Sequence, residues 1–133
     1  MTAAADRSPS PLTLLTSAPA PGTVRITVVG DLEYDTVEDL LLEVADCLAR
    51  HPHLGHLRLD LAELAMCDSM GLSALLQIRR FTGGVGARLH LDHRPPALDR
   101  LLDLTGTLDH LLAPPSEADR PAPGRTGALD VPD

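Results

Sequence analysis

The chain has 133 residues, the length of one ordinary domain, and its 19 acidic and 11 basic residues give a net charge of −8 with histidine neutral. This acidic balance argues against nucleic-acid binding, which depends on clustered cations, and no apolar run approaches the roughly 20 residues of a membrane span. The apolar residues are mostly Leu, Val and Ala, with one Phe, one Tyr and no Trp, so an aliphatic core is expected.

The N-terminus has no basic segment followed by an apolar stretch, so a secretory signal is not expected. Cys47 and Cys67 are isolated, without the spacing of zinc sites or redox motifs, which is typical of proteins from a reducing compartment. We therefore expect the protein to be cytoplasmic.

Both ends of the chain are rich in Pro and Ala among small and polar residues. Residues 1–11 and 114–133 carry too little apolar surface to offset the entropy of ordering them. Both are therefore predicted to be disordered tails, and residues 12–113 to form one domain.

The domain begins with two strand patterns. Residues 12–16 predict a short first strand, and the Pro-rich stretch 19–22 predicts a turn. Residues 23–29 are β-branched and partly alternate between polar and apolar, which predicts a second strand that ends at Gly30.

A helix pattern follows the second strand. Thr36 is expected to begin this helix in the manner of a capping box, with Asp39 in place of the usual Glu. Its apolar residues recur at helical spacing; they are Val37, Leu40, Leu41, Val44, Cys47 and Leu48.

The alternation of strands and helices continues to the end of the domain. Residues 57–61 and 88–91 predict two strands, and a helix from Ser69 through Phe81 is expected between them. A third helix follows, and residues 108–113 form an apolar element whose type the pattern does not decide. Gly and Pro residues are expected to mark the ends of these helices: Gly83 and Gly84 after the second helix, Pro95 and Pro96 before the third, and Gly106 at the end of the third.

Strands that alternate with helices predict an α/β fold. Such crossovers produce a small mixed or mostly parallel sheet backed by helices on at least one face.

Residues 66–72, between a predicted strand and a predicted helix, carry the chemistry of the chain. Ser69 lies where a helix N-cap belongs, and Asp68 beside the positive helix end is favourable by about 0.3–1 kcal/mol, so one interpretation is structural. The other is functional, because a hydroxyl at this turn is exposed and the helix amides can hold a phosphoryl group. Phosphorylation would add about −1.5 to −2 charges beside Asp68, and Gly71 would let a partner approach the backbone closely.

Five short motifs, in this order, resemble those of a STAS domain and, more narrowly, those of a stand-alone bacterial anti-sigma factor antagonist (anti-anti-sigma factor). They are Val28-Val29-Gly30-Asp31-Leu32-Glu33, Asp35-Thr36, Leu59-Asp60-Leu61, Cys67-Asp68-Ser69-Met70-Gly71-Leu72 and Leu104-Thr105-Gly106. The resemblance covers residues 12–112. It implies the fold of that family, a small mixed sheet backed by helices.

The resemblance also implies a partner-switching function. In that family, the serine after the Asp is phosphorylated by a partner anti-sigma factor that is also a GHKL-type serine kinase. The unphosphorylated antagonist binds this kinase and frees the sigma factor, and a PP2C-type phosphatase restores the antagonist.

When the functional residues of the family are matched to this sequence, the resemblance implies that Ser69 is the phosphate acceptor and Asp68 the acid before it. Glu33 stands where the family usually has an acid. With Met70 and Gly71, these residues form the expected partner-binding edge. Met70 occupies a position where the family often has Ser or Thr, so a second hydroxyl is missing there.

Two other functions are compatible with the same residues. The chain could be a STAS scaffold or adaptor module in a signalling or transport assembly, in which Ser69 is only a helix cap. It could also bind a small ligand, although no convergent polar pocket can be named from the sequence. Treatment with ATP and the cognate kinase distinguishes the phosphorylation switch from both.

The sequence predicts no enzyme, no cofactor and no metal site. It has no G-x-S-x-G motif, and the histidines of residues 51–56 lie in a loop with Pro and Gly that is a poor ligand cage. Arg79 and Arg80 are expected on the solvent face of the second helix, and residues 83–86 in a turn. Cys67 is expected to be a buried strand-end thiol rather than a redox sensor.

Overall fold

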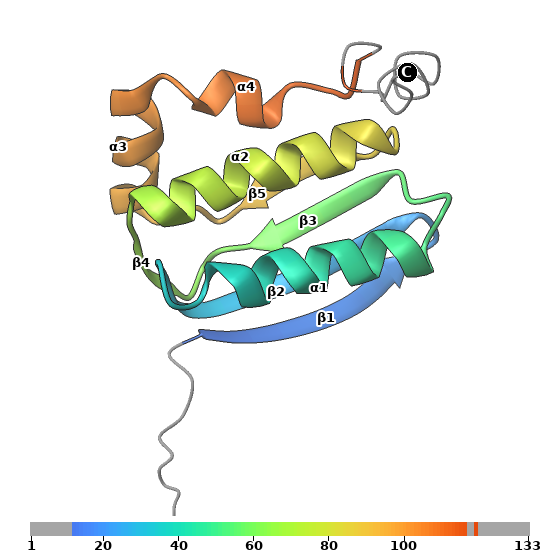
Figure 1. Cartoon of the computed structure of the whole chain (residues 1–133), viewed down its shortest axis with the longest axis horizontal. Helices are drawn as coiled ribbons and strands as arrows, with labels where there is room; N and C mark the ends of the chain where they lie inside the picture. Colours follow the sequence, from blue (N-terminus) through green and yellow to red (C-terminus); the bar gives the residue numbers. More distant parts are fainter. Residues whose placement is uncertain (1–11, 117–118, 120–133) are drawn as a thin grey trace, which may run out of the picture.

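The computed structural model describes residues 12–116 and residue 119. Within them, strands and helices alternate as Figure 1 shows. In chain order they are β1 (Leu12–Ala20), β2 (Thr23–Leu32), α1 (Val37–Arg50), β3 (His56–Asp60), β4 (Leu64–Cys67), α2 (Ser69–Gly84), β5 (Arg88–Asp92), α3 (Pro96–Thr105) and α4 (Leu108–Leu112). The predicted tails, 1–11 and most of 114–133, lie outside the described residues.

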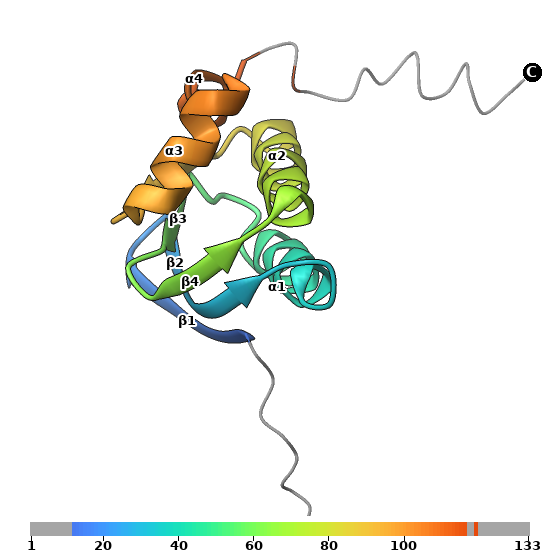
Figure 2. The same cartoon turned by 90° about the vertical axis from the view of Figure 1, so that its left-hand side faces the viewer.

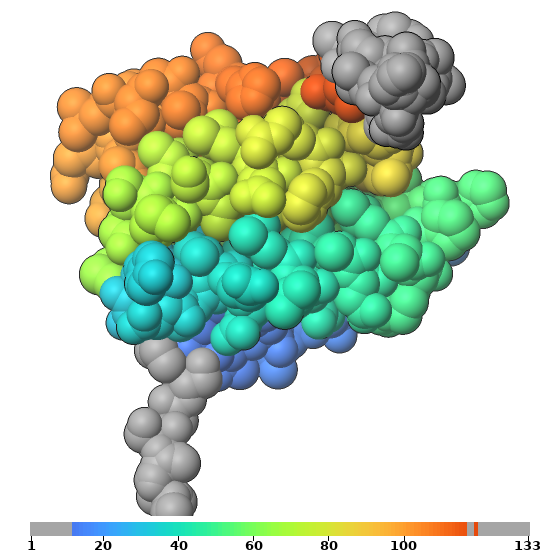
Figure 3. Space-filling model, in the orientation of Figure 1, coloured from blue at the N-terminus to red at the C-terminus, as the bar shows by residue number. Residues whose placement is uncertain are grey.

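The strands form one mixed sheet in the order β1-β2-β3-β5, with β4 also paired to β2. β1 is antiparallel to β2, whereas the β2–β3, β2–β4 and β3–β5 pairs are parallel. α1 and α2 lie on one face of this sheet (Figure 2), and together they cover it as a continuous surface (Figure 3). The expected α/β fold with a small mixed sheet backed by helices is therefore confirmed.

The core between the sheet and the helices is aliphatic, as the composition predicts. Inward-facing strand residues alternate with polar ones, and each fully buried Val, Leu or Ile contributes about 1.5–3 kcal/mol. The completely buried side chains include Val24 and Ile26 from β2, Leu57 and Leu59 from β3, Leu40 from α1, and Leu75 and Ile78 from α2.

Gly30 does not end the second strand, contrary to the sequence-based expectation. β2 pairs with β3 only as far as Thr27, and from Gly30 onward it pairs with β4 instead. The register shifts between Gly30 and Asp31, and Gly30 has a φ of 113°, a conformation that few other residues adopt. Gly30 thus forms a bulge at which β2 changes partners and continues to Leu32.

Other element boundaries also differ from the predictions. The first strand extends to Ala20, well past residue 16, and the second helix continues through Gly83 and Gly84. β4 was not predicted, because only Leu64 of its four residues is buried and no alternation marks it. The undecided element at 108–113 is the short helix α4, and the third helix ends at Gly106 as predicted.

The sheet face away from α1 and α2 carries polar side chains of β3 and β5. His56 Nδ1 lies 2.9 Å from His90 Nε2, and Arg58 forms an ion pair of 3.0 Å with Asp92. These residues alternate with the buried leucines of the same strands. Burial, followed by the charge of Arg58 and by the neighbouring His56 and Arg88, lowers the pKa of His90.

Arg79 is buried, so its expected place on the solvent face of α2 is wrong, while Arg80 is exposed as predicted. Arg79 Nη2 donates to Pro114 O at 3.0 Å and to Asp119 Oδ2 at 3.1 Å. The sequence pattern missed this burial because both partners lie in the Pro-rich stretch that follows α4.

Among the described residues, no helix is long and apolar enough to cross a membrane.

Candidate functional site

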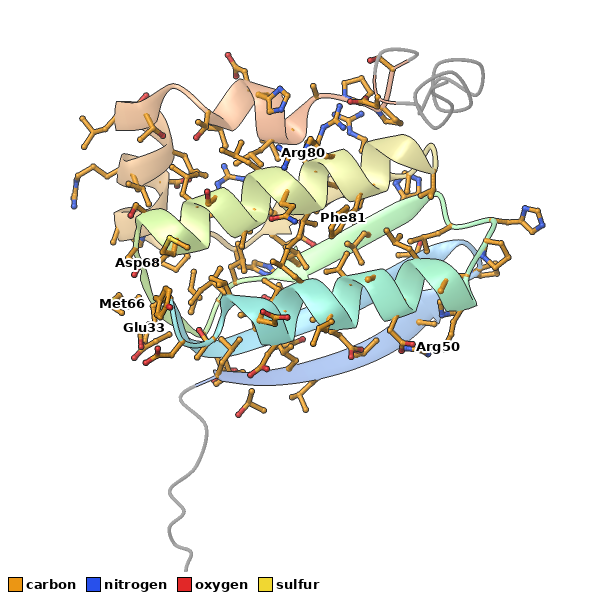
Figure 4. All side chains as sticks on the ribbon, in the orientation of Figure 1. Glu33, Arg50, Met66, Asp68, Arg80 and Phe81 are labelled. Atoms are coloured by element: carbon orange, nitrogen blue, oxygen red, sulfur yellow. The ribbon has the colours of Figure 1, made fainter. Side chains whose placement is uncertain are left out.

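The N-terminus of α2 lies beside the end of β2. Cys67, the last residue of β4, pairs with Leu32 at the end of β2, and the Asp68 amide donates to Leu32 O at 3.3 Å. The residues after the two strands therefore meet at one end of the sheet. Figure 4 shows Glu33, Met66 and Asp68 together at this end, beside the first turn of α2.

Asp68, not Ser69, is the N-cap of α2. Asp68 has extended backbone angles, φ −97° and ψ −169°, and its Oδ1 accepts a hydrogen bond of 2.9 Å from the Gly71 amide. Ser69 is the first helical residue and is exposed. Among the described residues, its hydroxyl has no hydrogen-bond partner, so the structural interpretation of Ser69 as a cap is wrong.

Gly71 is buried and faces inward rather than toward a partner. A Cβ on this residue would lie 2.6 Å from Cys67 Sγ and 2.6 Å from Leu32 O. Gly71 therefore allows the first turn of α2 to pack directly on the ends of β4 and β2. Its contribution to the site is to set the position of Ser69 and Met70, which lie on the surface above it.

The loop between β2 and α1 holds the second acidic residue of the site. Thr36 is buried, and its hydroxyl donates to Asp31 O at 2.7 Å and accepts from the Glu33 amide at 3.0 Å. Thr36 thus braces this loop and makes no side-chain cap of α1, contrary to the predicted capping box. Partial burial and the nearby carboxylates of Asp31, Asp35 and Asp68 raise the pKa of Glu33.

Large apolar side chains are exposed beside these acids. Tyr34 is 74% exposed, and Met66 and Met70 are each 41% exposed. We call the set Glu33, Tyr34, Met66, Asp68, Ser69 and Met70 the α2 N-terminal surface. Sequence analysis missed Tyr34 and Met66, although a lone tyrosine in the loop after a strand was a usable signal.

The thiol beside this surface is protonated, and the adjoining cleft is small. Burial, reinforced by the Asp68 carboxylate, raises the pKa of Cys67 to about 11, so its thiol stays protonated at neutral pH. The cleft between β4 and the start of α3, lined by Met66, Cys67 and Pro95 among others, holds about 30 Å³, room for one water molecule. Among the described residues, no cluster of three or more His, Cys, Asp or Glu side chains is placed to hold a metal.

The fold and the site together define a small α/β domain whose most distinctive surface is a helix N-terminus with an exposed serine after a capping aspartate. A family model described as "Mlab, STAS domain" matches residues 16–113. The chain therefore belongs to the STAS domain family, as the five motifs indicated.

Several solved structures have the same fold. An anti-sigma factor antagonist from Mycobacterium paratuberculosis is 25% identical, with a TM-score of 0.64 over 81% of this chain and 89% of that chain. The Bacillus cell fate determinant SpoIIAA in its phosphorylated form is 19% identical, with a TM-score of 0.61 over 86% of this chain and 99% of that chain. Part of the murine Solute Carrier 26 family member A9 anion transporter is also similar, at 15% identity and a TM-score of 0.64, over 81% of this chain and 21% of that chain.

Proposed function

We propose that the protein is an anti-sigma factor antagonist that is controlled by phosphorylation of Ser69. Unmodified, it binds an anti-sigma factor with GHKL-type serine kinase activity through the α2 N-terminal surface, and thereby releases a sigma factor. Phosphorylation by that kinase ends the binding, and a PP2C-type phosphatase restores it. In this role the protein is cytoplasmic and catalyses no reaction itself.

The observation that carries the proposal is the free hydroxyl of Ser69. Because Asp68 caps the helix, Ser69 is exposed without a structural task of its own. A kinase could take its proton and transfer a phosphoryl group without breaking any hydrogen bond that holds the fold. Similarity to anti-sigma factor antagonists, including the one at 25% identity, supports the same assignment.

The surroundings of Ser69 explain why a phosphate would change binding. The exposed Met66, Met70 and Tyr34 provide the apolar area that a partner would cover. A phosphate adds about −1.5 to −2 charges next to Asp68 and near Glu33, and these would have to be desolvated in the complex. The unphosphorylated surface therefore suits binding and the phosphorylated surface opposes it.

The test is phosphorylation and binding with the cognate anti-sigma factor. The full chain is incubated with this kinase and ATP, and the modified site is mapped by mass spectrometry. Ser69→Ala should abolish the added phosphate, whereas Ser73→Ala, an exposed serine one turn further along α2, should not. Phosphate that persists in Ser69→Ala would exclude Ser69 as the acceptor.

Binding is measured on the same proteins by calorimetric titration. Ser69→Ala should retain the affinity of the unmodified chain, and Ser69→Asp should bind at least tenfold more weakly. Equal affinity of Ser69→Asp and the wild type would contradict the switch.

A scaffold or adaptor role without phosphorylation is the second candidate. The observation that favours it is the similarity to a segment of an anion transporter. In that case Ser69 would remain unmodified after kinase treatment, and partner binding would be unaffected by Ser69→Asp.

A further inference from the structure

Basic side chains gather on one half of the sheet face that lies away from α1 and α2 (Figure 2). In the whole chain, acidic residues outnumber basic ones by 19 to 11. The six positions of this face nearest the N-terminal ends of β2, β3 and β5 nevertheless hold three arginines, two histidines, one threonine and no carboxylate. We call these positions the basic sheet patch; they are Thr23, Arg25, His56, Arg58, Arg88 and His90.

The strand register brings like charges together in this patch. Arg25 is directly opposite Arg58 on the neighbouring strand, and like charges in such pairs destabilise a sheet. Arg58 forms an ion pair with Asp92, whereas Arg25 and Arg88 form no ion pair with any described residue. Arg88 is exposed and the other two arginines are partly exposed. The patch is therefore an accessible surface whose positive charge is only partly neutralised.

An acidic surface of matching character follows the other end of β2. Residues 31–39 carry five carboxylates and no basic side chain, and we call them the acidic segment. None of these carboxylates forms an ion pair with a described residue. Tyr34 lies between Glu33 and Asp35 and is 74% exposed. A tyrosine ring binds a guanidinium by stacking on it, so the acidic segment offers both kinds of group that arginine prefers.

One chain cannot bring its own two surfaces together. Glu33 follows Arg25 by eight residues along β2, which corresponds to about 26 Å at about 3.3 Å per residue. The basic sheet patch lies at the N-terminal ends of the parallel strands, whereas the acidic segment begins at the C-terminal end of β2. Two copies arranged head to tail can form the contact, because the acidic segment of one then faces the patch of the next.

We propose that the basic sheet patch binds the acidic segment of a second copy of this chain, with Tyr34 stacked on an arginine of the patch. The two surfaces differ, so the contact is heterologous and the assembly grows as an open chain of copies. Glu33 and Tyr34 also belong to the α2 N-terminal surface, so a docked copy covers part of that surface. The inference does not depend on phosphorylation of Ser69.

Sedimentation velocity of the purified full chain tests the association. The contact includes few apolar side chains, so it is weak, and concentrations up to about 1 mM are needed to populate it. In about 0.1 M salt the Debye length is about 10 Å, which screens the net charges of two copies but leaves contacting pairs attractive. The weight-average mass should rise with concentration beyond that of a dimer, and should return to that of a monomer in about 1 M salt. A mass that stays monomeric at every concentration, or that stops at the dimer, would overturn the proposal.

Two double variants remove one surface each. Arg25→Gln with Arg88→Gln neutralises the patch, and Asp35→Asn with Glu38→Gln neutralises the acidic segment. Each should weaken self-association by about tenfold or more, because the contact loses two charge pairs. Circular dichroism and the urea midpoint establish that both variants are folded. Self-association equal to that of the wild type in either folded variant would contradict the assigned contact.

A mixture of the two double variants tests whether the contact is heterologous. Each variant alone should be largely monomeric, because its copies share the same defect. Together they should form a dimer of one copy of each and no larger species, because one intact acidic segment meets one intact patch. A mixture that stays as monomeric as its components would refute the head-to-tail arrangement.

A matched control separates the patch from the net charge of the chain. Arg80→Gln with Arg100→Gln removes the same charge from exposed positions on α2 and α3, and should associate as the wild type does. Equal weakening in this variant would show a general charge effect and overturn the proposal. So would cosedimentation of the wild type with vesicles of phosphatidylcholine and phosphatidylserine in the absence of self-association, which would assign the patch to a membrane surface.

Discussion

The identity of the residue that caps α2 has a measurable thermodynamic consequence. Asp68→Ala removes the acceptor of the Gly71 amide, a change that destabilises proteins by about 0.5–2 kcal/mol. It also removes a negative charge from the positive end of the helix, worth about 0.3–1 kcal/mol. Relief of repulsion between Asp68 and Glu33 offsets part of the second effect. We therefore expect a net loss of about 1–2 kcal/mol.

Ser69→Ala should behave quite differently. The Ser69 hydroxyl makes no hydrogen bond among the described residues, and alanine is the best helix former, so the free energy of unfolding should change by less than about 0.5 kcal/mol. Asp68→Asn keeps a capping oxygen and removes the charge, which makes it the control that separates the hydrogen bond from the electrostatic effect.

Urea unfolding at pH 7, followed by circular dichroism, measures all three variants on one scale. A loss of about 1 kcal/mol corresponds to about 4–8 °C in the melting temperature of a domain of this size, so a thermal scan provides an independent check. If Ser69→Ala loses about 1 kcal/mol or more while Asp68→Ala loses nothing, the cap has been assigned to the wrong residue and Ser69 is not free.

Three other properties of the chain can be measured. Exhaustive treatment with the cognate kinase should add one phosphate by intact-mass analysis, because Met70 has no hydroxyl and Ser73 lies about 6 Å further along α2; a doubly modified species would contradict this. Gly71→Ala should lower the free energy of unfolding by about 1–3 kcal/mol through overlap with Cys67 and Leu32, and an unchanged urea midpoint would show that the helix can shift freely. The lowered pKa of His90 means that, below about pH 6.5, the unfolded chain takes up a proton before the folded chain does, so stability should fall with acidification. His90→Gln should flatten this dependence below about pH 7 in urea titrations, and a slope equal to that of the wild type would refute the assignment.

Much of the fold follows from patterns that are local in the sequence. The alternation in β2, β3 and β5 and the helical spacing in α1 each depend on neighbouring residues, and each element was predicted with errors only at its ends. β4 could not be found in this way. Its four residues are held by pairing with β2, a contact between distant parts of the chain, and not by any alternation of their own.

The start of α2 was predicted correctly, but the residue that caps it was not. Asp and Ser are both favourable N-caps. Where they are adjacent in the sequence, the backbone angles decide which of the two caps the helix, and these angles cannot be read from the sequence. Similarly, the burial of Arg79 depends on Asp119, whose place beside α2 is set by tertiary structure. Local propensity could reveal neither the identity of the cap nor the burial of Arg79.

The bulge at Gly30 has a mechanical consequence for recognition. Beyond it, β2 leads into Glu33 while its new neighbour β4 leads into Asp68, and Leu32 and Cys67 are paired between them. The ladder therefore sets the backbone positions that lead into the two acids, and Thr36 braces the loop that carries Glu33. A partner that docks on both acids meets a prealigned template and loses little conformational entropy in ordering it. Leu32 and Cys67 thus link the backbone positions of the two acids, each of which directly follows its paired strand residue.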